Sequence, residues 1–186
     1  DFVTPELGSI IDYPLIQAAT TPPPAMEIAD MVETMHTFFP PMVGEYFVVA
    51  GINFKAFGLI DNNAMLAIKF GQHMEIDLVG VSSIALSATF LELEWSVRFL
   101  PEEGYLYMGG QITNRSYILM PNVHPTGSFA VAAWTGKQHH GEYVVTIGGY
   151  TSNFAAPAHY PQHLERMGMA FNIGMLRIKG GAYFAV

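Results

Sequence analysis

An alternation of apolar and polar residues within 87–100 constrains the fold of this chain more than any other feature. From position 91 to position 99 the odd positions are apolar and the even positions are polar or charged: Leu91, Leu93, Trp95, Val97 and Phe99 against Glu92, Glu94, Ser96 and Arg98. Because successive side chains of a β-strand point to opposite faces of a sheet, this period of two predicts a strand. We interpret its apolar face as buried and its charged face as solvated.

Segments with the same period lie on both sides of this strand. Turn-forming residues at 61–63 and at 101–104 separate some of them and predict antiparallel hairpins. The predicted strands are 46–57, 64–70, 74–81, 87–100, 105–119, 129–134 and 143–150, followed by a hairpin in 168–186. The chain is therefore predicted to be mainly β, an antiparallel meander that forms a sandwich, a barrel or an extended curved layer.

The first part of the chain follows a different pattern. Prolines at 22–24 and at 40–41 favour extended backbone, because proline fixes φ and lacks an N–H. Between them, residues 25–39 place Ile28, Met31, Val32, Met35 and Phe39 at spacings of three and four, which predicts a short amphipathic helix. The predicted organisation is a proline-rich arm over 1–44 and an antiparallel β domain over 45–186.

Composition indicates that much apolar surface has to be covered. Hydrophobic residues make up 51% of the chain and charged residues 13%, against about 25% charged in an ordinary soluble domain. The cover could be the chain's own core, the rest of a longer parent chain, a further copy or an apolar ligand. A net charge of −8 repels phosphate groups, so nucleic acid is not expected as a partner.

Several kinds of chemistry lack their motifs. The chain has no cysteine, which excludes disulfides, thiolate metal sites and a cysteine nucleophile, and leaves both the extracellular space and the cytoplasm open as compartments. No apolar run approaches the roughly 20 residues that a membrane-spanning helix requires. No glycine-rich phosphate-binding motif is present, and no cofactor is predicted.

The histidines offer the only metal candidates. His139 and His140 are adjacent, and His159 and His163 are four positions apart, a spacing that would place two imidazoles on one helical face. Pro161 lies between the second pair and disfavours that helix. We therefore predict no metal site and keep these four histidines as the weak candidates.

Glu92 and Glu94 are a pair of carboxylates with catalytic spacing. Residues two apart on a strand share a face and lie about 7 Å apart, within the separation used by inverting glycosidases. Alternating charges on a strand more commonly form its solvated face. No catalytic residue is predicted, and the chain is interpreted as non-enzymatic, with a hydrolase as the least favoured reading.

Several segments of the chain carry a family resemblance. The most specific are 146–150, with the sequence Thr-Ile-Gly-Gly-Tyr, and 157–161, with Pro-Ala-His-Tyr-Pro; 71–78, 100–105 and 177–184 add to them. From about residue 45 onward the chain resembles the domain of unknown function DUF6603, a family of large β-rich proteins from bacteria and fungi. The resemblance implies a β architecture and supplies no catalytic residues.

The functional expectation follows from the sheet. The chain starts at Asp1 and stops within a strand-like stretch, 181–186, so we expect it to be part of a longer protein. The predicted function is a structural or interaction β module that assembles through its sheet edges with the rest of its parent chain or with further copies. The alternative is a binding module for lipid or another apolar ligand, suggested by the many Met, Phe and Tyr residues.

Overall fold

The computed structural model describes residues 7–12, 16–17, 33, 40, 42–173 and 176–186. These residues form antiparallel β-sheets and one short 3₁₀-helix, η1. The elements are η1 (Ile10–Asp12), β1 (Tyr46–Ala56), β2 (Ile60–Phe70), β3 (Glu75–Leu86), β4 (Thr89–Leu100), β5 (Tyr105–Ile112), β6 (Tyr117–Ile118), β7 (Val123–Thr126), β8 (Ser128–Trp134), β9 (Tyr143–Ile147), β10 (Met167–Ile173), β11 (Leu176–Ala182) and β12 (Phe184–Ala185). Except for Glu33, the helix predicted over 25–39 lies outside the described residues.

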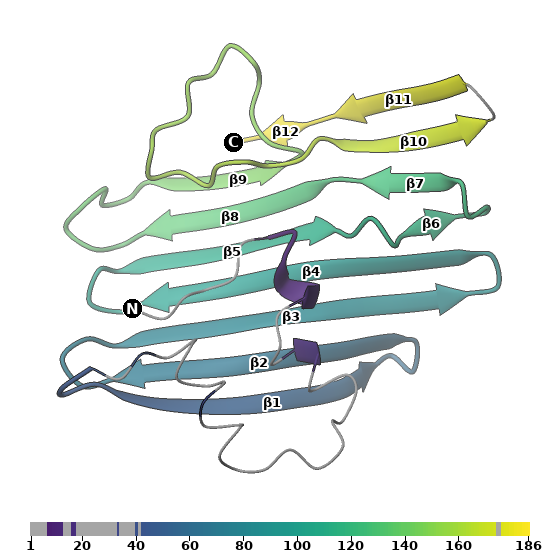
Figure 1. Cartoon of the computed structure of the whole chain (residues 1–186). Coiled ribbons are helices and arrows are strands. Elements are labelled where there is room, and N and C mark those ends of the chain that lie inside the picture. Colours follow the sequence, from purple (N-terminus) through teal and green to yellow (C-terminus); the bar gives the residue numbers. More distant parts are fainter. Residues whose placement is uncertain (1–6, 13–15, 18–32, 34–39, 41, 174–175) are drawn as a thin grey trace.

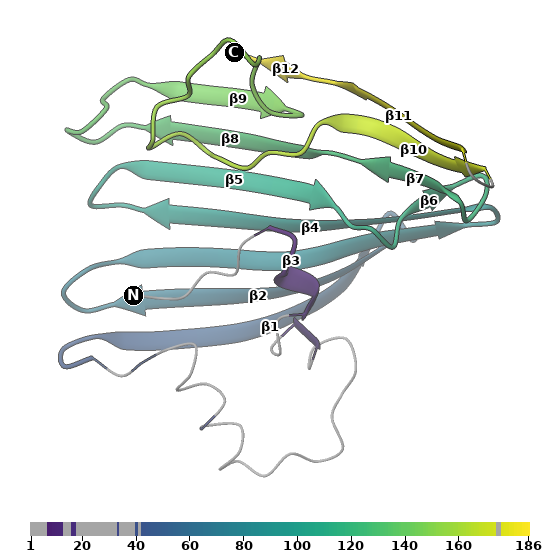
Figure 2. The ribbon, with the colours of Figure 1, turned by 45° about the horizontal axis from the view of Figure 1, so that its top comes forward.

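The main sheet is an open layer (Figure 1). Its strands follow the order β1-β2-β3-β4-β5-β8-β9-β12, with β6 paired to β4, and the first five form the meander that the sequence predicts. A second sheet, in the order β11-β10-β7, continues beyond the main one. Figure 2 shows the same strands tilted, with the sheet twisting from β1 toward β12. The strand order is that of an extended layer, because β1 pairs only with β2 in the described part of the chain.

The first hairpin turns earlier than the sequence predicts. Phe57 and Gly58 have φ of 52° and 69°, the left-handed backbone that a tight hairpin turn requires. The predicted turn at Asp61, Asn62 and Asn63 is wrong, because all three residues lie within β2 and pair with both β1 and β3. The side chains of Asn62 and Asn63 form hydrogen bonds across strands: Ser82 Oγ donates to Asn62 Oδ1, and Asn53 Nδ2 donates to Asn63 Oδ1, both at 2.6 Å.

The strand registers sort the side chains of the main sheet onto two faces. We call them the polar face and the apolar face. Every Asp, Glu, Lys and Arg in β1–β5 lies on the polar face: Lys55, Asp61, Lys69, Glu75, Asp77, Glu92, Glu94 and Arg98. The apolar face carries the alternate positions, which include Leu91, Leu93 and Val97 of β4. The alternation in the sequence is therefore preserved across the sheet.

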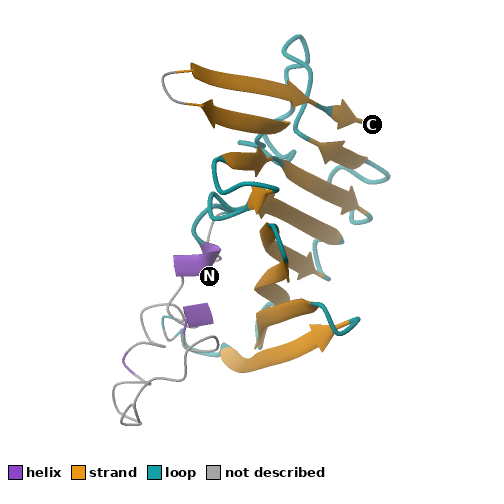
Figure 3. Ribbon diagram, turned by 90° about the vertical axis from the view of Figure 1, so that its right-hand side faces the viewer, coloured by secondary structure: helices purple, strands orange, loops and turns teal. Residues whose placement is uncertain are grey.

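The covered face is the polar one, which reverses the prediction for β4. Glu92, Glu94 and Ser96 are 5%, 3% and 4% exposed, whereas Phe99 on the apolar face is 39% exposed. One reason is the described N-terminal segment, residues 7–12 and 16–17, which packs on the polar face against β2, β3 and β4 (Figure 3). Thr113, after β5, contacts Glu92. Period-two alternation shows that the two faces of a strand differ, and a segment distant in sequence decides which one is covered.

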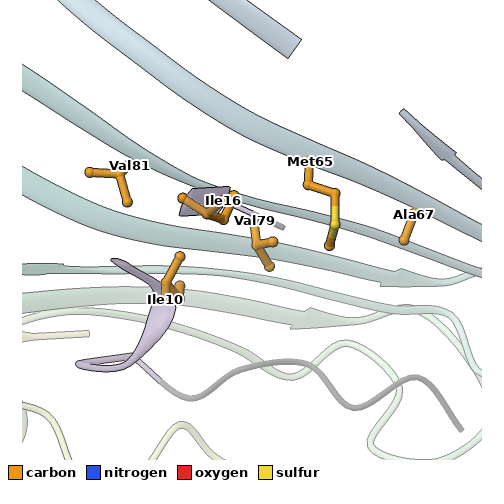
Figure 4. Close-up of a cluster of buried hydrophobic side chains, with 6 residues drawn as sticks. All are labelled: Ile10, Ile16, Met65, Ala67, Val79 and Val81. Carbon is orange, nitrogen blue, oxygen red and sulfur yellow. The ribbon is translucent and has the colours of Figure 1, made fainter. Parts of the chain in front are cut away.

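The N-terminal segment is held by apolar packing and by backbone hydrogen bonds. Ile10 and Ile16 are 0% and 1% exposed and pack among side chains of β2 and β3, as Figure 4 shows: Met65, Ala67, Val79 and Val81. The backbone N–H groups of Gly8 and Ile10 donate to Glu94 Oε2 at 2.8 and 3.0 Å. A buried carboxylate thus satisfies two backbone donors of the segment that covers it.

A network of charges is buried beside this core. Arg98 contacts Glu75 at 3.2 Å and Asp77 at 3.0 Å, and Lys69 Nζ lies 3.7 Å from Glu75. Burial raises the pKa of Asp77 to about 6, although the Arg98 guanidinium opposes this shift. The network makes the polar face costly to bury unless each partner is present.

The apolar face contains one polar chain of hydrogen bonds around a tryptophan. Trp95 Nε1 donates to Ser82 Oγ at 2.8 Å, and Ser82 Oγ donates to Asn62 Oδ1 at 2.6 Å. Gly80, opposite Trp95, leaves room for the indole, because a Cβ there would lie 2.6 Å from Trp95 Cζ2. These contacts fix the orientation of the largest side chain on this face.

Candidate functional site

The apolar face is the largest feature of the surface that the fold leaves uncovered. Within the described strands of the main sheet it carries no charged side chain. Large apolar residues on it are exposed from one edge of the sheet to the other: Tyr46, Val48, Ile52, Phe54, Phe70, Leu86, Phe99, Leu106, Met108, Tyr143, Ile147 and Phe184. No described element packs on this side in Figure 3. Free monomers rarely expose an apolar surface of this extent, so the face is a candidate interaction surface.

The edge strand β1 borders this surface. It is 11 residues long, contains no proline, and its only charged residue, Lys55, is paired with Asp61 at 3.0 Å. Soluble proteins commonly protect such edges with proline, extra charges or bulges. β1 lacks the first two of these devices.

Glu92 and Glu94, a carboxylate pair with catalytic spacing, are both buried, at 5% and 3% exposed. Glu94 binds the backbone of the N-terminal segment, and Glu92 Oε1 accepts a hydrogen bond from Thr113 Oγ1 at 2.8 Å. Arg115 Nη1 lies 3.5 Å from the other oxygen of Glu92. Both side chains therefore make contacts that hold the fold together.

Of the four histidine candidates, the structure brings two together. His139 lies in the turn between β8 and β9, and His159 lies in the loop from β9 to β10, which returns toward that turn (Figure 1). Their rings stack with centroids 3.6 Å apart and planes at 16°. His140 instead turns its Nδ1 toward Thr135 O at 3.0 Å, and His163 borders a separate cleft.

Glu142 joins this histidine pair, and sequence reasoning missed it. Its Oε1 lies 3.1 Å from His139 Nδ1, and its Oε2 lies 2.9 Å from His159 Nε2. Hydrogen bonds from His159 and then His139 hold the pKa of Glu142 below its usual value. The spacing of three from His139 was a local signal for this residue, but its proximity to His159 depends on the loop.

Aromatic side chains form the wall behind the cluster. The ring planes of Trp134 and His159 lie at 82° with centroids 5.2 Å apart, and Trp134 stacks on Tyr160 at 5.4 Å. Tyr105 also packs against Trp134, at 5.3 Å. Burial raises the pKa of the Tyr105 hydroxyl to about 12, so this wall is uncharged at neutral pH.

The cluster opens onto a cleft of about 1040 Å³ at the end of the sheet. Charged residues lie on its rim, including Arg98, Glu102 and Glu103, while Trp134 and Tyr105 form its inner side. The three side chains of the cluster are partly accessible, at 39% for His139, 38% for Glu142 and 27% for His159. His139 and His159 line the cleft, so a solute can reach both imidazoles from this side.

The comparison with protein families covers the whole chain. Residues 1–186 match the model described as a family of unknown function, DUF6603. The chain belongs to the DUF6603 family. The match includes the proline-rich first 44 residues, so the boundary near residue 45 predicted for the resemblance was too late. No curated protein and no solved structure matches this DUF6603 chain.

The described part of this DUF6603 chain contains no helix that is long and apolar enough to cross a membrane, as the sequence predicts. Two features of its surface stand out for function. One is the apolar face with its neighbouring edge strand, and the other is the cluster of His139, Glu142 and His159 beside the aromatic wall.

Proposed function

We propose that this DUF6603 chain is a non-catalytic β-sheet interaction module that packs its apolar face against the apolar face of a second copy. The observation that carries the proposal is the strict segregation of charge: in β1–β5 all charged side chains lie on the polar face. A sheet hydrophobic on one face gains stability by burying that face against another layer. A second copy offers a surface of matching chemistry.

The size of the face is sufficient for a stable pair. Neighbouring strands lie about 4.8 Å apart and rise about 3.3 Å per residue, so eight strands of ordinary length present roughly 1,000 Å². Two such faces would bury roughly 2,000 Å² in total, at the upper end of standard specific interfaces. Sheets stacked in this way lie about 10 Å apart, with aliphatic and aromatic side chains interleaved.

The distribution of charge favours a twofold arrangement. The chain carries a net charge of −8, so two copies repel each other wherever their charged surfaces approach. Pairing through the apolar faces directs the charged faces away from each other. An isologous pair also uses the same patch on both subunits, as closed twofold symmetry requires.

Assembly through sheet edges, the route that the sequence predicts, uses a different surface. β1 could pair edge to edge with another strand, because it is long and lacks proline. Such pairing would leave Leu106 and Met108 in the middle of the apolar face exposed, at 44% and 41%. Face pairing covers these two side chains, so it is the arrangement we propose.

An apolar ligand is the competing occupant of the same face. A lipid layer or detergent would also cover Leu106 and Met108, but ligand sites that hold a small apolar molecule are usually concave. The described apolar face is instead the surface of an open sheet, in which β1 and β12 form the two edges. Uptake of lipid by a chain that remains monomeric is thus an outcome that contradicts the proposal.

Light scattering after size-exclusion chromatography tests this function. We expect wild-type chain to pass from monomer to dimer as its concentration rises, and Leu106→Lys to raise the dissociation constant at least about 100-fold, because a charge would be buried without a partner. Val43→Lys is the matched control, since Val43 is 97% exposed outside the strands. A wild-type chain that stays monomeric at every concentration would refute face pairing.

A further inference from the structure

We propose that His139, Glu142 and His159 bind one divalent transition-metal ion, with Zn²⁺ as the best chemical match. The three ligand atoms, one from each side chain, all lie within 4.8 Å of one another. This site is separate from the apolar face, so it does not depend on the proposed pairing of copies.

The distances suit a single small ion. Zn²⁺ binds imidazole nitrogen and carboxylate oxygen at about 2.0–2.2 Å, which places tetrahedral ligand atoms about 3.3 Å from one another. The Glu142 oxygens now lie 3.1 and 2.9 Å from the two histidine nitrogens. The imidazole lone pairs lie in the ring planes, so binding one ion requires the two stacked, partly exposed rings to tilt toward each other.

The donor set selects the class of ion. Two imidazoles and one carboxylate favour first-row ions such as Zn²⁺, whereas Ca²⁺ and Mg²⁺ prefer oxygen donors throughout. Three protein ligands leave a fourth position on Zn²⁺ for water or another small molecule. His139 and His159 line the cleft, so a small molecule in the cleft could reach the fourth position.

The surroundings hold the ligands in place. Trp134 contacts both rings edge-on, at 6.3 Å for His139 and 5.2 Å for His159. Its backbone closes the turn that carries Glu142, because Trp134 N donates to Glu142 O and Gly141 N donates to Trp134 O, both at 2.9 Å. Such supporting contacts orient metal ligands before the ion arrives.

Backbone conformation gives a further indication. His139 has φ of 56°, a left-handed conformation that is uncommon for a residue other than glycine and that concentrates at functional sites. In this turn the carbonyl oxygen of His139 accepts a hydrogen bond from Glu142 N at 2.9 Å, which ties two of the three ligands together. A bound cation would also offset the negative charge of Glu142.

Isothermal titration of the full chain with ZnCl₂ tests the site. We expect one Zn²⁺ per chain, and a loss of Zn²⁺ affinity of at least about 100-fold in His159→Gln and in Glu142→Gln. Replacing a residue that only supports a metal ligand already lowers metal affinity 10- to 100-fold. His140→Gln is the matched control: His140 lies one position from His139 and faces the Thr135 carbonyl. Its affinity is expected to stay within about twofold of wild type.

Co²⁺ provides a second readout, because a four-coordinate site gives a much stronger visible absorption than hydrated Co²⁺. Circular dichroism checks that each variant folds. If His159→Gln does not fold, the test rests on Glu142→Gln, which changes a partly exposed side chain. Absence of saturable Zn²⁺ binding by wild type would overturn the proposal. Equal loss in His140→Gln and His159→Gln would overturn it as well.

Discussion

Glu94 and Ile10 are joined across 84 positions of sequence: the Ile10 backbone N–H donates to the buried Glu94 Oε2 at 3.0 Å. The same oxygen accepts the Gly8 N–H at 2.8 Å. This relationship places the N-terminal segment on the polar face and leaves the opposite, apolar face to other partners.

Replacing Glu94 tests how firmly this segment is held. We expect Glu94→Ala to lower the free energy of unfolding by about 2–4 kcal/mol, because the buried N–H of Ile10 and the partly buried N–H of Gly8 lose their acceptor. Glu94→Gln keeps an amide oxygen at that place and is expected to lose less than half as much. Urea denaturation measures both variants. Equal losses would show that the hydrogen bonds to Gly8 and Ile10 are not the source of the effect.

The pH dependence of stability is expected to report on Asp77. Its pKa of about 6 in the folded chain lies above the ordinary 3.8, so the folded chain binds this proton more tightly than the unfolded chain does. The resulting stability is present below about pH 4 and is lost as the pH rises through about 6. In Asp77→Asn this loss is absent, because the side chain does not ionise.

We therefore expect the unfolding free energy of Asp77→Asn, relative to wild type, to rise by on the order of 2–3 kcal/mol between about pH 4 and pH 7. Urea denaturation at several pH values measures the difference. Asp61→Asn is the control, because Asp61 forms an exposed pair with Lys55 and such pairs contribute less than about 1 kcal/mol. A difference between Asp77→Asn and wild type that stays constant with pH would contradict the assignment.

Two glycines of the main sheet, Gly80 in β3 and Gly51 in β1, separate packing from backbone effects. A Cβ at Gly80 would lie 2.6 Å from Trp95 and 2.8 Å from Asn63 O, whereas a Cβ at Gly51 meets no atom within 4 Å. We expect Gly80→Ala to destabilise the fold by about 1–3 kcal/mol through overpacking. Gly51→Ala is expected to be neutral or to stabilise by up to about 1 kcal/mol. Thermal unfolding compares the two, and similar losses would argue against the close fit at Trp95.

Much of the strand layout could be predicted because it is encoded locally. The alternation in 87–100 and the turn after it predict the hairpin that the structure forms from β4 and β5. The turn between β1 and β2 was misplaced, since Asn62 and Asn63 are frequent in turns but here bond across strands. Phe57 adopts the left-handed backbone conformation of this turn, but bulky residues rarely adopt it, so a phenylalanine at this position did not indicate a turn.

The side of burial and the histidine cluster could not be predicted, because both depend on distant segments. Glu94 on β4 is bound by the backbone of Gly8 and Ile10, and Glu92 by Thr113 and Arg115, and no pattern within 87–100 indicates these distant partners. His159 approaches Glu142 across 17 positions through a loop without regular structure. The sequence named His139 and His159 as candidates on spacing alone, and only the fold adds Glu142.

Chemical labelling of the apolar face tests the central claim most directly. The chain has no cysteine, so Met108→Cys and Val43→Cys each introduce a single thiol, in the middle of the apolar face and outside the strands respectively. We expect alkylation of Met108→Cys to slow at least about tenfold as the protein concentration rises, as pairing of the two faces removes this position from water. Val43→Cys is expected to react at a constant rate. A constant rate at both positions up to the highest concentration would contradict the pairing of apolar faces.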